Sequence, residues 1–158
     1  MDTITKPDAE LSIVVAAPAA KVWSTIADVT RIPEWSPVCH RVDWIGDSRD
    51  AAVGARFRGH NRLNGARWSR ECVITEAEPG RLLSFSTLFK GEESTRWRYS
   101  LQPEDGGTRV SEAYEIVRMP RWVRFLRSMP GAAAKSERDT ETNLGTSLER
   151  LKAIVEAV

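Results

Sequence analysis

The sequence has few of the features that identify disulfide-rich, metal-binding or membrane-spanning proteins. Only two of its 158 residues are cysteines, Cys39 and Cys72, and their spacing is not that of zinc ligands. No disulfide framework or metal site is therefore predicted, and a reducing, cytoplasmic location is favoured. No apolar run is long enough to cross a bilayer, and the start lacks a basic stretch followed by an apolar core. We therefore expect neither an integral membrane segment nor export.

Net charge is also nearly absent. The chain has 23 Lys and Arg against 22 Asp and Glu, so no field of the whole molecule would attract nucleic acid or an anionic membrane, and no nucleic-acid partner is expected. Any electrostatic recognition must therefore come from a local group of charges.

The length predicts a single domain over residues 1–158, with a folded core from about residue 10 onward.

Familiar catalytic motifs are missing as well. There is no GxSxG, HExxH or dinucleotide-binding glycine pattern. Gly54 and Gly59 have the spacing of a phosphate-binding loop, but His60 occupies the position of the required lysine. The only histidines, His40 and His60, fall on different predicted strands and are typical of ordinary surface or core residues. We predict no cofactor, assign no catalytic residue with certainty, and favour a protein that is not an enzyme.

Alternation of apolar and polar residues predicts seven strands. The first covers residues 10–16 and is followed by two short helices, over residues 19–27 and 28–31. The other six strands are expected at residues 38–45, 55–61, 66–77, 81–89, 94–102 and 108–117. Short turns rich in glycine, such as Asp105-Gly106-Gly107, separate these strands and make neighbours antiparallel.

Helical spacing returns after residue 117. Residues 120–129 form a basic amphipathic segment, and residues 132–158 form one long helix. The buried seam of the long helix consists of Leu144, Leu148, Leu151, Val155 and Val158. Before Leu144 the seam contains only Ala133, Glu137, Thr140 and Glu141, so the first half of this helix is expected to border a partly polar space.

Four segments resemble one known superfamily over nearly the whole chain. They are residues 18–23 (PAAKVW), 28–37 (DVTRIPEWSP), 73–80 (VITEAEPG) and 106–112 (GGTRVSE). These segments and the order of elements are similar to those of SRPBCC proteins, the Bet v 1-like, START-related superfamily that includes polyketide cyclases and dehydrases. The resemblance implies an α+β helix-grip fold, in which a curved seven-stranded antiparallel sheet surrounds a long C-terminal helix. It implies binding of a small hydrophobic molecule, such as a lipid or a polyketide-like metabolite, in an internal cavity.

Aromatic residues supply most of the candidate ligand contacts. Wide, rigid rings suit either the core or the wall of an apolar pocket. The candidates on the predicted sheet and the short helical region are Trp35, Phe57, Trp68, Phe85, Trp97 and Tyr99. The direction of Trp68 is ambiguous, because Cys72-Val73-Ile74 is a continuous apolar run that hides the alternation of its strand. Thr140, on the long helix, is a further candidate.

Glu112 is the candidate with the strongest chemical interest. It alternates in phase with Val110 and Tyr114, so its carboxyl is expected on the apolar face of the sheet. A buried carboxyl without a partner has a raised pKa. Two other interpretations remain: a bulge after Val110 that turns Glu112 outward, and a structural salt bridge with an arginine such as Arg70.

The basic segment 120–129 leaves several roles open. Trp122, Phe125, Leu126 and Met129 share one helical stripe, and no acidic residue lies between Glu115 and Glu137. Because large apolar side chains are costly to leave in water, we expect this stripe to be buried as a gate over the cavity, with Trp122 and Phe125 contacting the ligand. A packing helix with a solvated face, or peripheral membrane or protein contact, are the alternatives.

Three functions therefore compete. The first is binding of a small hydrophobic ligand without catalysis. The second is a cyclase or aromatase in which Glu112 or a histidine moves a proton, which requires an acid and a base in one cavity. The third is an interaction module that uses segment 120–129, which requires that its apolar stripe be exposed.

Overall fold

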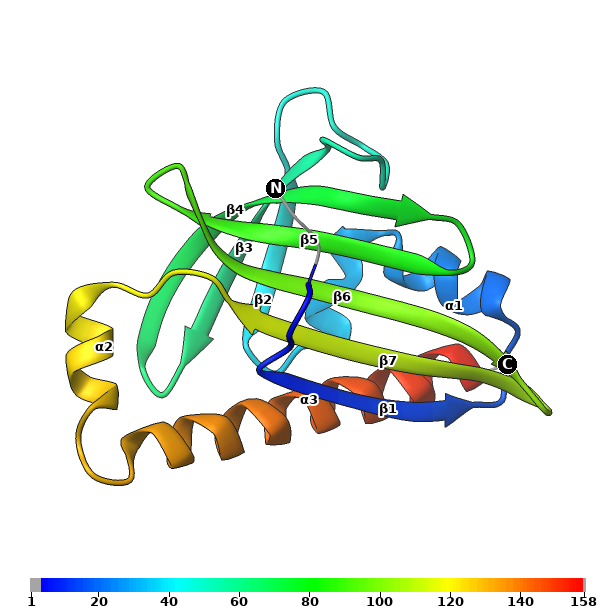
Figure 1. The fold of residues 1–158 in the computed structure, drawn as a ribbon. Coiled ribbons are helices and arrows are strands. Elements are labelled where there is room, and N and C mark those ends of the chain that lie inside the picture. The colour runs from blue at the N-terminus through cyan, green and yellow to red at the C-terminus, as the bar shows by residue number, and fades with distance from the viewer. Residues whose placement is uncertain (1–3, 158) are drawn as a thin grey trace.

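A computed structural model describes residues 4–157 as one curved antiparallel sheet with a long helix along it (Figure 1). The strand order is β1-β7-β6-β5-β4-β3-β2, so only β1 pairs with a strand distant in sequence. The strands are β1 (Ala9–Val15), β2 (Cys39–Trp44), β3 (Arg56–Leu63), β4 (Ala66–Glu78), β5 (Leu82–Phe89), β6 (Glu92–Glu104) and β7 (Gly107–Ile116). The predicted seven-stranded antiparallel sheet is confirmed.

The helices lie before and after the meander. They are α1 (Ala19–Ile26), the 3-10 helix η1 (Val29–Glu34), α2 (Arg121–Arg127) and α3 (Ala132–Glu156). Asp28 caps η1 by accepting a hydrogen bond from the Thr30 amide. The prediction that this helix ends at Arg31 is wrong. The helix continues to Glu34, because the bonds from Arg31 N to Asp28 O and from Trp35 N to Ile32 O close the turns on either side of Pro33, which has no N–H to donate.

Glycines are required at one hairpin turn and at one edge of the sheet. Asn64 and Gly65 both have positive φ, the geometry of a two-residue hairpin whose twist matches β3 and β4. At the start of β7, a Cβ on Gly107 would lie 1.9 Å from the carbonyl oxygen of Val15. Glycine therefore permits the end of β1 to pass against the β6–β7 turn.

The long helix packs unequally along its length. Its buried residues are Leu144, Ser147, Leu148, Leu151 and Val155, whereas none of residues 132–143 is buried. The predicted loss of the apolar seam before Leu144 is thus seen in the packing; Val158 lies outside the described residues. Within residues 4–157, no helix has the length and apolar character needed to cross a membrane.

Candidate functional site

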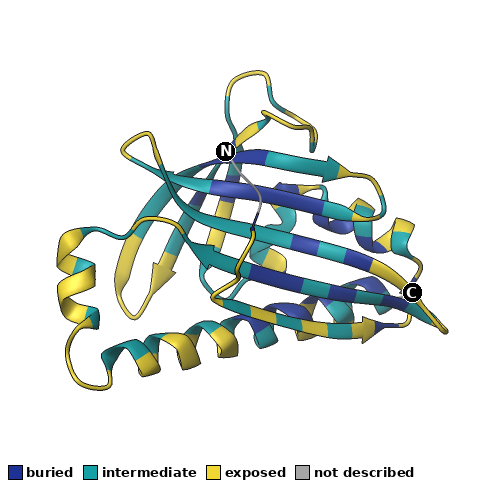
Figure 2. Ribbon diagram, viewed as in Figure 1, coloured by how far each residue is buried: buried dark blue, intermediate teal, exposed yellow. Residues whose placement is uncertain are grey.

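The concave face of the sheet is packed at one end and accessible at the other (Figure 2). The dark blue residues gather where α1, η1 and the second half of α3 lie. Toward α2 the side chains of β6 and β7, including Trp97 and Tyr114, are only partly buried. A molecule approaching from solvent would therefore meet the concave face at the α2 end.

A row of aromatic rings crosses this face. Each ring contacts the next, with centroids 6.2, 5.2, 6.4 and 4.7 Å apart in the order Trp44, Phe57, Phe85, Trp97 and Tyr114. The contacts are edge-to-face, offset-stacked or tilted, as aromatic quadrupoles favour. The middle rings, Phe57 and Phe85, are buried, and the rings at both ends are partly buried, so the row forms a continuous apolar band that reaches the accessible end.

Glu112 lies two residues from Tyr114 along β7, on the same face of the sheet and nearer the core. It faces Tyr99 across the β6–β7 ladder, next to the pair of Trp97 and Tyr114. The Tyr99 hydroxyl donates to Glu112 Oε1 at 2.8 Å, and Trp35 Nε1 donates to that hydroxyl oxygen at 3.3 Å. Three buried side chains from η1, β6 and β7 thus form one hydrogen-bonded chain that ends at a carboxyl group.

Burial controls the protonation of Glu112 and Tyr99. Glu112 is 3% exposed, and loss of hydration raises its pKa to about 8, although the hydrogen bond from Tyr99 acts in the opposite direction. Burial, reinforced by the charge of Glu112, also raises the pKa of Tyr99 well above that of a free tyrosine. At neutral pH the site therefore holds a mainly protonated carboxyl group beside a protonated phenol.

The second oxygen of Glu112 is unpartnered. Oε2 is buried and accepts or donates no hydrogen bond among residues 4–157. Buried polar atoms are normally satisfied, so such an atom indicates an absent water or ligand, or a functional group. A protonated Glu112 can donate one hydrogen bond from this oxygen to a carbonyl or hydroxyl oxygen of a bound molecule.

Both alternative interpretations of Glu112 are wrong. The β6–β7 register is continuous from Val110 through Glu112, so no bulge turns the side chain outward. The Arg70 guanidinium lies 4.8 Å from the centroid of the Phe89 ring, which gives this cation a different partner. The hydrogen-bond partner is Tyr99, which the register places directly opposite.

The other predicted contact residues fall into three groups. Trp35, Phe57, Phe85 and Tyr99 belong to the buried core, and Trp97 packs partly buried against it. Trp68 and Thr140 are also partly buried. Trp122 and Phe125 lie on α2 and do not join the row of aromatic rings.

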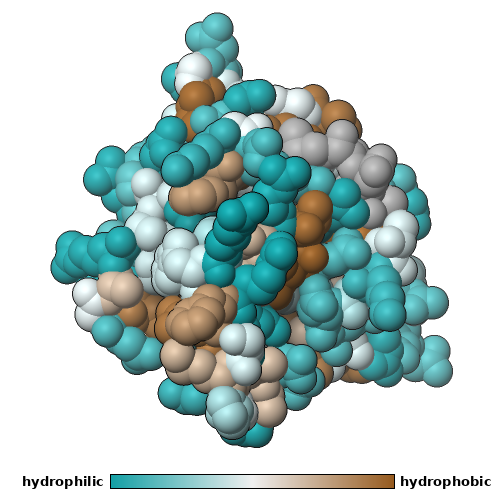
Figure 3. Space-filling model, turned by 60° about the vertical axis from the view of Figure 1, so that its left-hand side comes forward, coloured by the Kyte–Doolittle hydropathy of each residue, from teal (hydrophilic) through white to brown (hydrophobic). Residues whose placement is uncertain are grey.

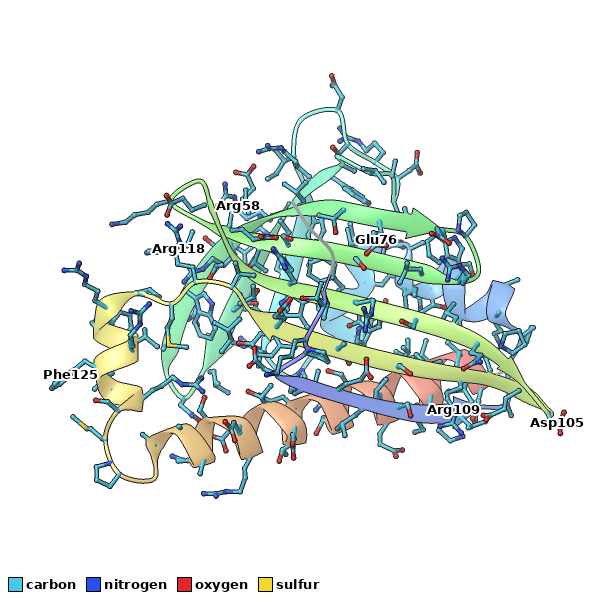
Figure 4. The ribbon with its side chains drawn as sticks, in the orientation of Figure 1. Arg58, Glu76, Asp105, Arg109, Arg118 and Phe125 are labelled. Atoms are coloured by element: carbon cyan, nitrogen blue, oxygen red, sulfur yellow. The ribbon has the colours of Figure 1, made fainter. Side chains whose placement is uncertain are left out.

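The expectation that the α2 stripe is buried is wrong. Trp122 and Phe125 are 66% and 67% exposed, and in Figure 4 Phe125 points away from the sheet. The reason is a contact on the other face of α2, where Arg127 Nη1 donates to Ser136 Oγ of α3 at 3.3 Å. This contact holds the face with Arg127 against α3 and leaves the apolar stripe, Arg121 and Arg124 exposed to solvent.

A small cavity of about 20 Å³ lies between β7 and the first half of α3. This volume is roughly that of one water position. Its lining includes Thr140, one of the candidate ligand contacts, together with Tyr114, Arg127 and Ser136, which the sequence did not suggest as site residues. The alternation that placed Glu112 inward could have identified Tyr114. No local pattern brings Arg127 to Ser136, because the turn between α2 and α3 creates that contact.

Other polar groups lie apart from this site. Because Phe57 faces the core, alternation along β3 places His60 on the opposite face, where its Nε2 is 3.1 Å from Asp43 Oδ2. Within the described part of the chain, no group of three or more His, Cys, Asp or Glu residues could hold a metal ion. His40 is exposed, with its ring centroid 6.5 Å from that of His60, so neither histidine accompanies Glu112 as an acid–base partner.

A second depression, of about 470 Å³ and open to solvent, lies along β3, β4 and the β5–β6 turn. Its cations are Arg56, Arg58, Arg70 and Lys90. Glu71 pairs with Arg56 and lies 4.0 Å from Arg58, so part of this positive charge is already compensated. In Figure 4 Arg58 lies at the outer end of the sheet, away from the long helix.

Comparison with known proteins supports this fold and identifies the family. A solution structure of a polyketide cyclase-like protein from Corynebacterium glutamicum is 31% identical, has a TM-score of 0.63, and aligns over 97% of this chain and 94% of that one. No curated protein matches the sequence significantly.

Two aromatase/cyclases share the fold at 17% identity. The Zhui aromatase/cyclase from Streptomyces sp. R1128 has a TM-score of 0.67, over 94% of this chain and 92% of that one. The two-domain StfQ of the steffimycin pathway has a TM-score of 0.74, over 94% of this chain and 50% of that one. The family model described as polyketide cyclase/dehydrase and lipid transport matches residues 6–156. The chain therefore belongs to this family, within the SRPBCC or Bet v 1-like superfamily.

Proposed function

We propose that the protein binds a small, mainly apolar molecule on the concave face of the sheet, with Glu112 as its hydrogen-bonding partner. The observation that carries this proposal is the buried Glu112 carboxyl, whose Oε2 has no partner among residues 4–157. The aromatic row supplies the apolar surface that such a ligand requires. A carbonyl or hydroxyl oxygen on the ligand would accept the hydrogen bond from the protonated carboxyl group.

Ligand entry requires an opening at the α2 end. A cavity of about 20 Å³ holds a water and not a metabolite, so the first half of α3 must move away from β7 or the ligand must replace side chains there. The packing supports such movement, since none of residues 132–143 is buried. The core around Leu148 and Leu151 would remain in place and hold the second half of the helix.

A titration with a neutral, environment-sensitive dye such as Nile red tests the binding surface. We expect about one dye per folded protein, and weaker binding by the variant Trp97→Glu, because a charge would enter the apolar row. The matched control is Gln102→Glu, an exposed position on the same strand. Absence of dye binding by the folded protein would refute the proposed surface.

The role of Glu112 is tested with a carbonyl-bearing apolar ligand, found by native mass spectrometry of gently purified protein. Glu112→Leu should weaken binding about tenfold, because it removes the donor, whereas Glu112→Gln retains a donor and should weaken it less. Because the pKa of Glu112 is about 8, wild-type affinity should fall as the pH rises through that value, whereas Glu112→Gln affinity should stay constant. Equal affinity of all three proteins at every pH would exclude Glu112 as the ligand's partner.

A cyclase or aromatase is the second candidate function. The specific observation in its favour is the pKa of about 8 at Glu112, which suits a group that exchanges a proton near neutral pH. If this function is correct, the wild type should convert a poly-β-ketone substrate to a dehydrated cyclic product detectable by mass spectrometry. Glu112→Gln should then bind the substrate and form no product. If the wild type binds the substrate without converting it, catalysis is excluded and ligand binding alone is supported.

A further inference from the structure

The amphipathic helix α2 presents its apolar side to solvent. Trp122 and Phe125 are 66% and 67% exposed, and Leu126 and Met129 are each 47% exposed. These four residues follow the helical spacing i, i+3, i+4 and i+7 and therefore form one stripe. A helix on a globular domain normally turns such a stripe inward. Here the opposite face, with Arg127, contacts α3, so the stripe is suited to a surface outside the domain.

The segment around this stripe is strongly cationic. Residues 116–136 contain no acidic residue and five basic ones, which are Arg118, Arg121, Arg124, Arg127 and Lys135. The rest of the chain has 18 basic and 22 acidic residues, so its formal charge is negative. Arg118 pairs with Glu92, but Arg121 and Arg124 form no ion pair within residues 4–157. Positive charge is thus concentrated beside the exposed apolar stripe.

The position of α2 leaves this surface accessible. In Figure 1, α2 stands at one end of the molecule, beyond the ends of the strands. Figure 3 turns this side forward and shows hydrophobic side chains low on the surface, with strongly hydrophilic ones directly above them.

The size of this surface argues against a protein partner. A stable protein interface involves about 20–30 residues on each side, more than this seven-residue helix and its flanks offer.

We infer that α2 is a docking surface for an anionic lipid bilayer. The apolar stripe would enter the boundary between head groups and acyl chains, and Arg121 and Arg124 would reach the lipid phosphates with their long side chains. The apolar and cationic parts of one short helix match the apolar and anionic layers of such a membrane. This inference does not depend on the identity of the ligand or on Glu112.

Sedimentation of the full chain with vesicles tests the inference. The probes are vesicles of phosphatidylcholine with phosphatidylserine, and vesicles of phosphatidylcholine alone. We expect binding to the mixed vesicles and at least about tenfold weaker binding to the neutral ones. Arg121→Gln with Arg124→Gln should weaken binding to mixed vesicles about thirtyfold, since two arginines contribute about 2 kcal/mol at an anionic surface.

Trp122→Ala with Phe125→Ala should also reduce vesicle binding at least about tenfold, by removing apolar surface from the stripe. The controls are Arg62→Gln with Arg67→Gln and Val53→Ala with Leu63→Ala, which remove exposed charges or exposed apolar groups from other loops and strands. All variants should keep the thermal stability of the wild type.

Three results would overturn the inference. The first is no binding to mixed vesicles, and the second is equal binding to both kinds of vesicle. The third is a dimer, seen by gel filtration, that Trp122→Ala with Phe125→Ala dissociates in the absence of any vesicle binding; this would assign the stripe to contact between copies of the chain. None of these results would alter dye binding on the concave face, so the two proposals fail separately.

Discussion

Replacing Glu112 by Gln should change the pH dependence of stability. The pKa of Glu112 in the folded protein is about 8, above the 4.5 of an unperturbed glutamate. The unfolded chain therefore loses this proton at lower pH than the folded protein does. Folding therefore opposes ionisation, and stability falls as the pH rises from the unfolded pKa toward the folded one. Below the unfolded pKa both states are protonated, and this penalty is absent.

The size of the effect follows from the linkage relation. Between these two pKa values the contribution of Glu112 falls by about 1.4 kcal/mol per pH unit. From about pH 5 to about pH 7.5, the free energy of unfolding of the wild type should therefore fall by about 3 kcal/mol relative to Glu112→Gln. Glutamine keeps the size of the side chain and cannot ionise, so the difference between the two proteins isolates the carboxyl group.

Urea unfolding, followed by circular dichroism at several pH values, provides the measurement. Glu149→Gln is the matched control, because Glu149 is exposed on α3 and its removal should leave the pH dependence of the wild type unchanged. Parallel curves for the wild type and Glu112→Gln across this range would refute the reasoning, since they would mean that Glu112 titrates equally in both states.

Other substitutions test the packing around the site. Tyr99→Phe should lower the free energy of unfolding by about 1–3 kcal/mol in chemical denaturation, because Trp35 Nε1 and Glu112 Oε1 lose their partner; no loss would mean that water replaces the hydroxyl. The same variant should raise the pKa of Glu112 further, measured by NMR titration, since that hydrogen bond lowers it. Gly107→Ala should destabilise the β1–β7 edge, because its Cβ would lie 1.9 Å from the Val15 carbonyl oxygen; an unchanged melting temperature would contradict this close approach.

Local sequence patterns were sufficient for most of the fold. Period-two alternation and glycine-containing turns placed all seven strands, because both signals depend only on neighbouring residues. The same alternation placed Glu112 on the inner face, and the thinning apolar seam predicted the weak packing of α3 before Leu144. Boundaries were less certain, as in η1, which continues through Pro33 to Glu34 although a proline usually ends a helix.

Only the tertiary structure decided which residues meet. The β6–β7 register, and not a sequence pattern, makes Tyr99 the partner of Glu112 in place of Arg70. Among residues 4–157, Glu112 Oε2 has no partner. An aromatic residue on the inner face has the same pattern whether it fills the core, as Phe57 does, or borders an accessible surface, as Trp97 does. The α2 stripe was visible in the sequence, but its direction depends on the turn into α3 and on the contact of Arg127 with Ser136. Amphipathic spacing shows that a helix has an apolar face; what that face meets depends on how the helix is held against the rest of the chain.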